Sequence, residues 1–200
     1  MARTVTPTIR LFAAAAACAA ALLSNAISAE AQSWREYRYS GFAIRFPVEP
    51  TVENGTYTTA EGAVVDARIY SAEQEGALYK VTVADLSRVH QSEAQAIGEA
   101  VGGLSENGDV VVDIAHRVNG VLGRQLSIVS HDGSRSTIAL FYRNRRLYLV
   151  EGTILPTHDD PMSPDGARFQ QSLRFIIPNA RVDFPSDLRR GPLNFIDGTR

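Results

Sequence analysis

The chain has 200 residues, of which 44% are hydrophobic and 21% are charged, and its formal net charge is −2 at neutral pH. This composition excludes a disordered chain, a collagen-like repeat and a multi-span membrane protein. The near balance of charge provides no global field that would attract nucleic acid. The length is enough for one domain and too short for two comfortable ones.

The first 31 residues have the pattern of a secretory signal peptide. Arg3 and Arg10 carry positive charge, residues 11–23 form an apolar run, and residues 29–31 read Ala-Glu-Ala, which fits the small-x-small cleavage rule. The run is shorter than the roughly 20 residues that a membrane-spanning helix needs. We therefore expect export to the periplasm with cleavage after Ala31; cleavage after Ala29 is the alternative.

Cys18 is the only cysteine of the chain. Residues 15–18, Ala-Ala-Ala-Cys, loosely resemble a lipid-attachment motif, but the usual leucine is missing three residues before the cysteine. Lipidation at Cys18 is therefore the weaker alternative. After cleavage at Ala31 no thiol remains, which excludes a cysteine nucleophile and a cysteine-ligated zinc.

Alternating polar and apolar residues predict strands throughout the first part of the exported chain. The predicted strands are 34–39, 42–46, 56–59, 63–70 and 78–86. Turns are expected at Ser40-Gly41, Asn54-Gly55, Glu61-Gly62 and Glu75-Gly76. In the strand 63–70, Asp66 and Arg68 lie on the side opposite the apolar residues.

A change of period between His90 and Gly108 predicts a helix. Ala94, Ile97, Val101 and Leu104 recur at helical spacing, with Ser92 as a cap and Gly108 as a stop. The glycines at 98, 102 and 103 each cost about 1 kcal/mol relative to alanine in a helix. We interpret them as positions of close packing against a sheet.

Four more strands follow, at 110–115, 122–128, 137–142 and 147–154. Turns at 119–120, 132–133 and 144–145 make them an antiparallel meander. A closing helix is expected to begin at Ser163-Pro164, with the proline in its first position, and to pack Phe169 and Leu173 on the sheet. Prolines at 178, 185 and 192 indicate an extended tail over 178–200.

Together these elements predict an α+β fold over residues 32–177: a single domain with a mostly antiparallel sheet covered by helices. The order of elements resembles the PsbP-like family, which includes the photosystem II oxygen-evolving accessory protein and many small exported bacterial proteins. The resemblance spans about 34–175. It is carried by the aromatic strand 34–39, Gly41–Pro47, Tyr79–Val83, Arg146–Gly152 and Phe169–Phe175.

That resemblance implies an α/β/α sandwich and an accessory or binding role without catalysis. Some members of the family bind calcium or manganese, and a eukaryotic relative binds a small GTPase. The family shares no active-site motif, so the resemblance assigns a functional role to no residue of this chain.

The clearest candidate for a partner-binding site is a basic stretch around the turn at 144–145. Arg135, Arg143, Arg145 and Arg146 lie in a segment, 133–150, that contains no acidic residue. Clustered guanidinium groups suit carboxylates and phosphates. We expect a protein or anionic partner here; an ordinary solvated turn is the alternative.

The four histidines, at 90, 116, 131 and 158, are scattered. Residues 158–160, His-Asp-Asp, could ligate zinc or manganese, but a polar loop before a helix explains them better. Residues 131–133, His-Asp-Gly, indicate a hairpin turn, and His116 is expected to be half-buried. The seven tyrosines lie mostly in predicted strands, where core packing or a ligand-binding face would use them.

We therefore expect no catalytic residue, metal ion or cofactor. The predicted function is that of an exported, non-enzymatic accessory or binding protein of the periplasm or cell envelope, with neither nucleic acid binding nor a membrane span. The alternative is a small periplasmic hydrolase or metal-dependent enzyme that uses converged histidines and aspartates.

Overall fold

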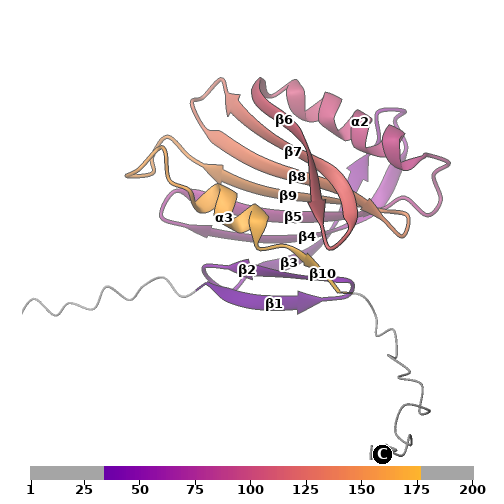
Figure 1. The fold of residues 1–200 in the computed structure, drawn as a ribbon, viewed down its shortest axis with the longest axis horizontal. Coiled ribbons are helices and arrows are strands. Elements are labelled where there is room, and N and C mark those ends of the chain that lie inside the picture. Colours follow the sequence, from indigo (N-terminus) through magenta and orange to yellow (C-terminus); the bar gives the residue numbers. More distant parts are fainter. Residues whose placement is uncertain (1–33, 177–200) are drawn as a thin grey trace, which may run out of the picture. The chain divides into compact units, whose positions relative to one another are not determined.

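The computed structural model describes residues 34–176, so the predicted signal peptide and the tail 178–200 lie outside the described residues. The described part contains these strands and helices in chain order (Figure 1): β1 (Arg35–Tyr39), β2 (Phe42–Phe46), β3 (Thr51–Thr58), β4 (Val64–Gln74), β5 (Ala77–Asp85), α2 (Glu93–Ser105), β6 (Gly108–Val118), β7 (Val121–Ser130), β8 (Arg135–Arg143), β9 (Arg146–Ile154), α3 (Asp165–Gln171) and β10 (Arg174–Phe175). No helix among them is long and apolar enough to cross a membrane.

Most strands form one antiparallel sheet of seven, in the order β3-β4-β5-β9-β8-β7-β6. A second, three-stranded sheet has the order β1-β2-β10. Helix α2 packs on one face of the large sheet, where Ala96, Ile97 and Ala100 join an apolar cluster with strand residues. Helix α3 and the small sheet cover the other face. The α+β class and the mostly antiparallel sheet with helical cover are confirmed.

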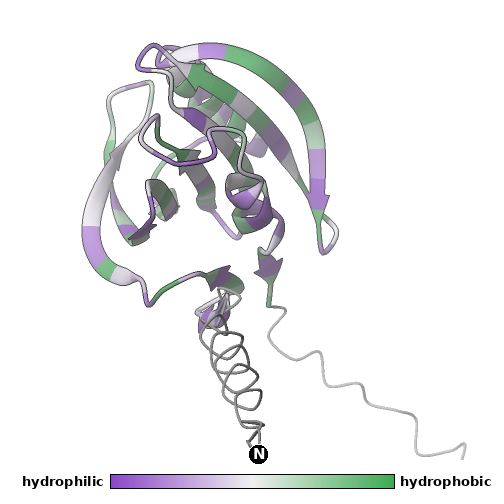
Figure 2. Cartoon of the chain, turned by 90° about the vertical axis from the view of Figure 1, so that its left-hand side faces the viewer, coloured by the Kyte–Doolittle hydropathy of each residue, from purple (hydrophilic) through white to green (hydrophobic). Residues whose placement is uncertain are grey.

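Alternation of side chains explains the strands, and hydrophobic and hydrophilic bands alternate along them in Figure 2. The turn expected at Asn54-Gly55 is wrong, because both residues lie inside β3 and pair with β4. A Cβ at Gly55 would lie 2.8 Å from Cδ1 of Ile69, so the glycine makes room for that side chain. The chain turns later, at Gly62, whose φ of +83° suits glycine.

Helix α2 begins at the predicted cap. The side chain of Ser92 accepts a hydrogen bond from the backbone of Gln95, and the side chain of Gln95 bonds back to the Ser92 backbone, which makes a capping box. The helix ends at Ser105, and Gly108 is the first residue of β6 rather than the helix stop.

The glycines of α2 do not pack against the sheet, contrary to our prediction. A Cβ at Gly98, Gly102 or Gly103 would meet nothing within 4 Å. The buried side chains of the helix are those of Ala96, Ile97 and Ala100, and Val101 and Leu104 pack against the same cluster, so only Ala94 of the predicted stripe lies outside it. The small alanines, not the glycines, allow the close approach.

The meander from β6 to β9 forms as predicted, with tight turns at the expected positions. Asn119 and Gly120 have φ of 48° and 82°, and Asn144 and Arg145 have φ of 51° and 60°. Two successive positive φ values define the mirror-image turn that matches the twist of a hairpin.

Helix α3 lies directly on the large sheet. Phe169 is fully buried, and its ring centroid lies 4.9 Å from that of Phe46 and 5.2 Å from that of Tyr79. A Cβ at Gly152 of β9 would lie 2.5 Å from the carbonyl oxygen of Gly166, so backbone meets backbone here. The packing of Phe169 and Leu173 is confirmed, whereas Pro164 is the N-cap residue rather than the first residue of the helix.

Strand β6 forms one edge of the seven-stranded sheet. Its pairing with β7 shifts register between Val110 and Val112, which marks a bulge at Val111. The side chains of Val111 and Ile114 are 60% and 51% exposed. An apolar edge strand is therefore accessible in the described part of the chain.

Candidate functional site

The turn between β8 and β9 places the predicted basic residues at the tip of a hairpin. The two-residue turn at 144–145 fixes Arg143 opposite Arg146 in the ladder. The backbone N–H of Leu86 donates to the carbonyl of Arg145 at 2.9 Å, which ties the turn to the end of β5. The tip is thus held by backbone hydrogen bonds on two sides.

The four predicted arginines do not form one cluster. Arg135 lies at the other end of β8, about 26 Å from Arg143 at roughly 3.3 Å per residue. The guanidinium of Arg143 lies over the ring of Phe175, 5.2 Å from its centroid, and donates to the carbonyl of Ile176 at 3.5 Å. This leaves Arg145 and Arg146 as the exposed cations of the tip.

Neither of these two side chains forms a hydrogen bond or an ion pair with another residue in the range 34–176. Arg146 faces Asp85, its partner in the ladder between β5 and β9. Hydrogen bonds donated by Ser87 hold the pKa of Asp85 below its ordinary value, and the nearby charge of Arg146 lowers that pKa further. Asp85 is therefore ionised at neutral pH.

A hollow of about 610 Å³ opens beside Arg146, between the small sheet and the large one. The small sheet contributes Tyr39, Ser40 and Phe42. The large sheet contributes the remaining lining residues: Val52, Asn54, Asp66, Ala67, Arg68, Tyr70, Val83, Asp85 and Arg146.

One wall of this hollow is aromatic. The ring centroids of Tyr39 and Tyr70 lie 4.1 Å apart, and Phe42 lies 5.2 Å from Tyr39 and 5.4 Å from Tyr70. Burial, followed by the proximity of Tyr70, raises the pKa of Tyr39 to about 12. The phenol of Tyr39 therefore stays protonated and can donate a hydrogen bond.

The polar side of the hollow is partly ordered in advance. Nη1 of Arg68 donates to Oδ1 of Asn54 at 3.0 Å, and the two residues face each other across β3 and β4. A hydrogen bond from Arg68 also opposes the rise that burial causes in the pKa of Tyr70. The guanidinium is thus oriented by two neighbours.

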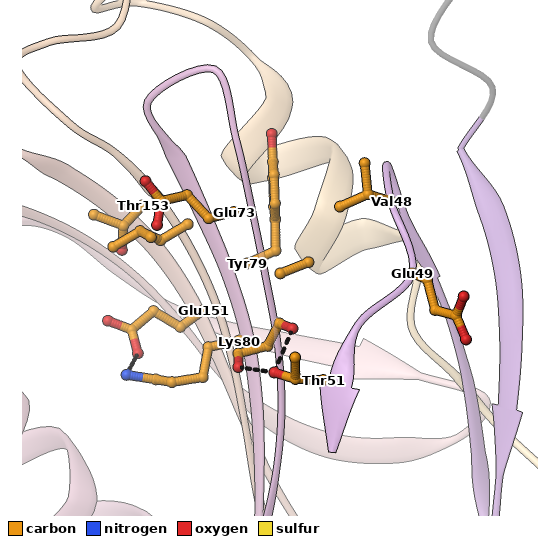
Figure 3. A pocket seen from close by; sticks show the side chains of 11 residues that line it. Val48, Glu49, Thr51, Glu73, Tyr79, Lys80, Glu151 and Thr153 are labelled. Carbon is orange, nitrogen blue, oxygen red and sulfur yellow. Dashed lines mark hydrogen bonds and ion pairs between the residues drawn. The ribbon is translucent and has the colours of Figure 1, made fainter. Parts of the chain in front are cut away.

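A second hollow, of about 450 Å³, lies along the starts of β3 and β5 and the ends of β4 and β9 (Figure 3). Its lysine, Lys80, forms an ion pair with Glu151 at 2.7 Å. The hydroxyls of Thr51 and Ser71 lie 3.0 Å apart. The cation of this hollow is therefore already neutralised by a neighbouring carboxylate.

In the described part of the chain, no three metal-ligating side chains form a cluster. Nδ1 of His158 accepts the backbone N–H of Asp160 at 2.9 Å. His131 is exposed beside the predicted turn. His116 is half-buried, as expected, with its Nε2 3.0 Å from Nε2 of Gln170.

Reasoning from the sequence missed most of the hollow. The alternation in the strand 63–70 did separate Asp66 and Arg68 from the apolar residues, and this is a signal of a polar function on that face. It could not show that Tyr39, from the first strand, lies across from them.

No family model matches the chain, and no curated protein matches it. Among solved structures, the chain is similar to the solution structure of cyanobacterial PsbP (CyanoP) from Synechocystis sp. PCC 6803, with 12% sequence identity and a TM-score of 0.49. The match covers 72% of this chain and 94% of that one. Membership of the PsbP-like family stays a prediction, and the α+β class rests on the strands and helices of this chain.

Proposed function

We propose that the protein is exported and acts in the periplasm or cell envelope as a non-enzymatic accessory or binding protein. The observation that carries the proposal is the hairpin tip, where Arg145 and Arg146 are exposed on a backbone-anchored turn. Because the turn is held in place, an acidic partner meets these cations at reduced entropic cost.

A capture experiment from the periplasmic fraction tests the docking role. Wild-type protein is expected to retain partners that Arg145→Ser/Arg146→Ser loses, and high salt should weaken the interaction because exposed charges are screened within about 8–10 Å. Arg135→Ser is the matched control, since it removes an exposed arginine from the other end of the same strand. Equal recovery by all three proteins would contradict the proposal.

N-terminal sequencing of protein recovered from cells tests export. We expect the sequence Gln-Ser-Trp, which begins at Gln32, because the cleavage rule is met at Ala31. A lipid-modified Cys18 at the N-terminus would show instead that the protein is anchored to a membrane.

The alternative function, a hydrolase or metal-dependent enzyme, is favoured by no observation on the described residues. It depends on the convergence of histidines with acids. The hydrogen-bond partners of His116 and His158 are an amide side chain and a backbone N–H.

A further inference from the structure

The charged residues of the hollow beside Arg146 follow from the register of β4, β5 and β9. Asp85 pairs with Arg146. Asp66 is next to Ala67 and Asp85 is next to Ala84, so both aspartates lie one step beyond the Ala67–Ala84 pair, at the same end of the ladder between β4 and β5. Arg68 lies two residues further along β4, opposite Val83. The two aspartates are therefore neighbours across β4 and β5, with Arg146 beside Asp85 on β9 and Arg68 two residues from Asp66 on the same sheet face.

These two aspartates and two arginines carry formal charges that cancel. Among the ion pairs of residues 34–176, none joins one of these aspartates to one of these arginines. A ligand with net negative charge would gain from the arginines and lose against the aspartates. A ligand that carries an ammonium group and a carboxylate on the same carbon atom would gain from both.

The rest of the hollow specifies what such a ligand carries besides its charges. Tyr39, Phe42 and Tyr70 form an aromatic wall in contact with the polar residues. The volume of the hollow, about 610 Å³, falls within the roughly 300–1,000 Å³ that is typical of small-molecule sites. An aromatic or large apolar group would contact the half-buried ring of Tyr39, which is backed by the buried rings of Phe42 and Tyr70.

We propose that this hollow binds a free α-amino acid with an aromatic or large apolar side chain. Arg68 and Arg146 bind its carboxylate, Asp66 and Asp85 bind its ammonium group, and the aromatic wall packs against its side chain. The protonated hydroxyl of Tyr39 supplies a further donor. This site lies beyond the docking role of the hairpin tip, because three of its four charged residues are outside the hairpin.

Calorimetric titration of the purified protein with L-phenylalanine tests the site. We expect saturable binding to one site. The analogues 3-phenylpropionate, which lacks the ammonium group, and phenethylamine, which lacks the carboxylate, should bind at least tenfold more weakly because each leaves one pair of charges without a partner. Absence of L-phenylalanine binding, or equal binding of either analogue, would overturn the proposal.

Two variants connect the binding to the named residues. Arg68→Gln and Asp66→Asn should each weaken L-phenylalanine binding at least tenfold, whereas Arg135→Gln, an exposed arginine far from the hollow, should leave it unchanged. Melting temperatures show whether each variant is folded, and the analogue titrations on the wild type need no variant. Unchanged binding in a folded Arg68→Gln and a folded Asp66→Asn would overturn the assignment.

The same titrations separate this proposal from the proposed function. Arg145→Ser should impair partner capture and leave L-phenylalanine binding intact, since Arg145 does not line the hollow. Failure of the titration with L-phenylalanine leaves the hairpin proposal standing, and failure of the capture experiment leaves the amino-acid site standing.

Discussion

The two faces of the seven-stranded sheet are packed with different kinds of side chain. The face under α2 is mainly aliphatic: Val65, Ala67, Ala84, Leu86, Ala96, Ile97, Ala100, Leu126, Ile128, Ile138, Leu140 and Leu147. The face under α3 and the small sheet is largely aromatic: Phe42, Phe46, Tyr70, Tyr79, Phe141, Tyr148, Phe169 and Phe175.

This difference follows from the elements that cover each face. A helix of 13 residues with alanines on its inner side approaches the sheet closely and is matched by small aliphatic groups. The other face is covered by a seven-residue helix and short strands, and large rings fill the space beside the close approach of Gly152 and Gly166. The cover ends near Tyr39, and the candidate amino-acid site opens there.

The largest effect on stability is expected when the buried ring of Phe169 is removed from the aromatic face. Phe169→Ala should lower the free energy of unfolding by about 3–5 kcal/mol, because a fully buried ring that contacts Phe46 and Tyr79 leaves a cavity. Urea denaturation measures this loss. An unchanged unfolding midpoint would show that α3 does not cover the sheet.

The corresponding change on the aliphatic face is Ile97→Ala. We expect a loss of about 2–3 kcal/mol, near the lower end of the range for such truncations, because Ile97 is 9% exposed and the small residues around it can partly close the space. The same urea titration applies. A loss larger than that of Phe169→Ala would show that truncation on the aliphatic face costs more stability than truncation on the aromatic face.

The buried tyrosines of the aromatic face also predict that the stability of the fold decreases at alkaline pH. Burial, followed by the charges of Asp165 and Glu75, raises the pKa of Tyr79 to about 12. Unfolded chains release this proton from about pH 10 while the folded protein keeps it, so stability is full below pH 10 and falls as the pH rises toward 12. Thermal unfolding between pH 8 and 11.5 measures the fall, and Tyr79→Phe should make it shallower. An unaltered slope in the variant would show that Tyr79 does not contribute.

The smallest change in stability is expected from a substitution on the outer side of α2. Gly98→Ala should raise the free energy of unfolding by about 0.5–1 kcal/mol, because the added methyl group meets no atom within 4 Å and alanine favours the helix. Ala96→Gly, on the buried side, is the matched control and should destabilise. A destabilising Gly98→Ala would place this residue against the sheet after all.

Local rules predicted the strands and turns well because alternation and turn residues act over a few neighbours. They were wrong where tertiary contacts override local preference. Asn54-Gly55 has the sequence of a turn, but the Ile69 side chain on the next strand needs the space beside Gly55. The close packing predicted for the glycines of α2 was wrong, because alanine and glycine are both small and only the sheet shows which of them lies inside.

The candidate sites were predicted only in part, for a geometric reason. Arg135 and Arg143 share an acid-free segment, but the strand between them separates their side chains. The amino-acid site joins Tyr39 to Arg68 and Arg146, which requires the register of three strands and the position of the small sheet. Neither is encoded in the spacing of these residues along the chain.

The bulged edge strand β6 affects which assemblies the folded chain can form. An apolar strand at the edge of a sheet is a template to which another chain can add its own strand, and long runs of such additions lead to fibres. At Val111 two residues oppose one on β7, so the outer hydrogen-bonding groups of β6 lose their regular spacing at this point. The bulge at Val111 therefore disfavours edge-to-edge pairing with another chain while the valines around it stay apolar.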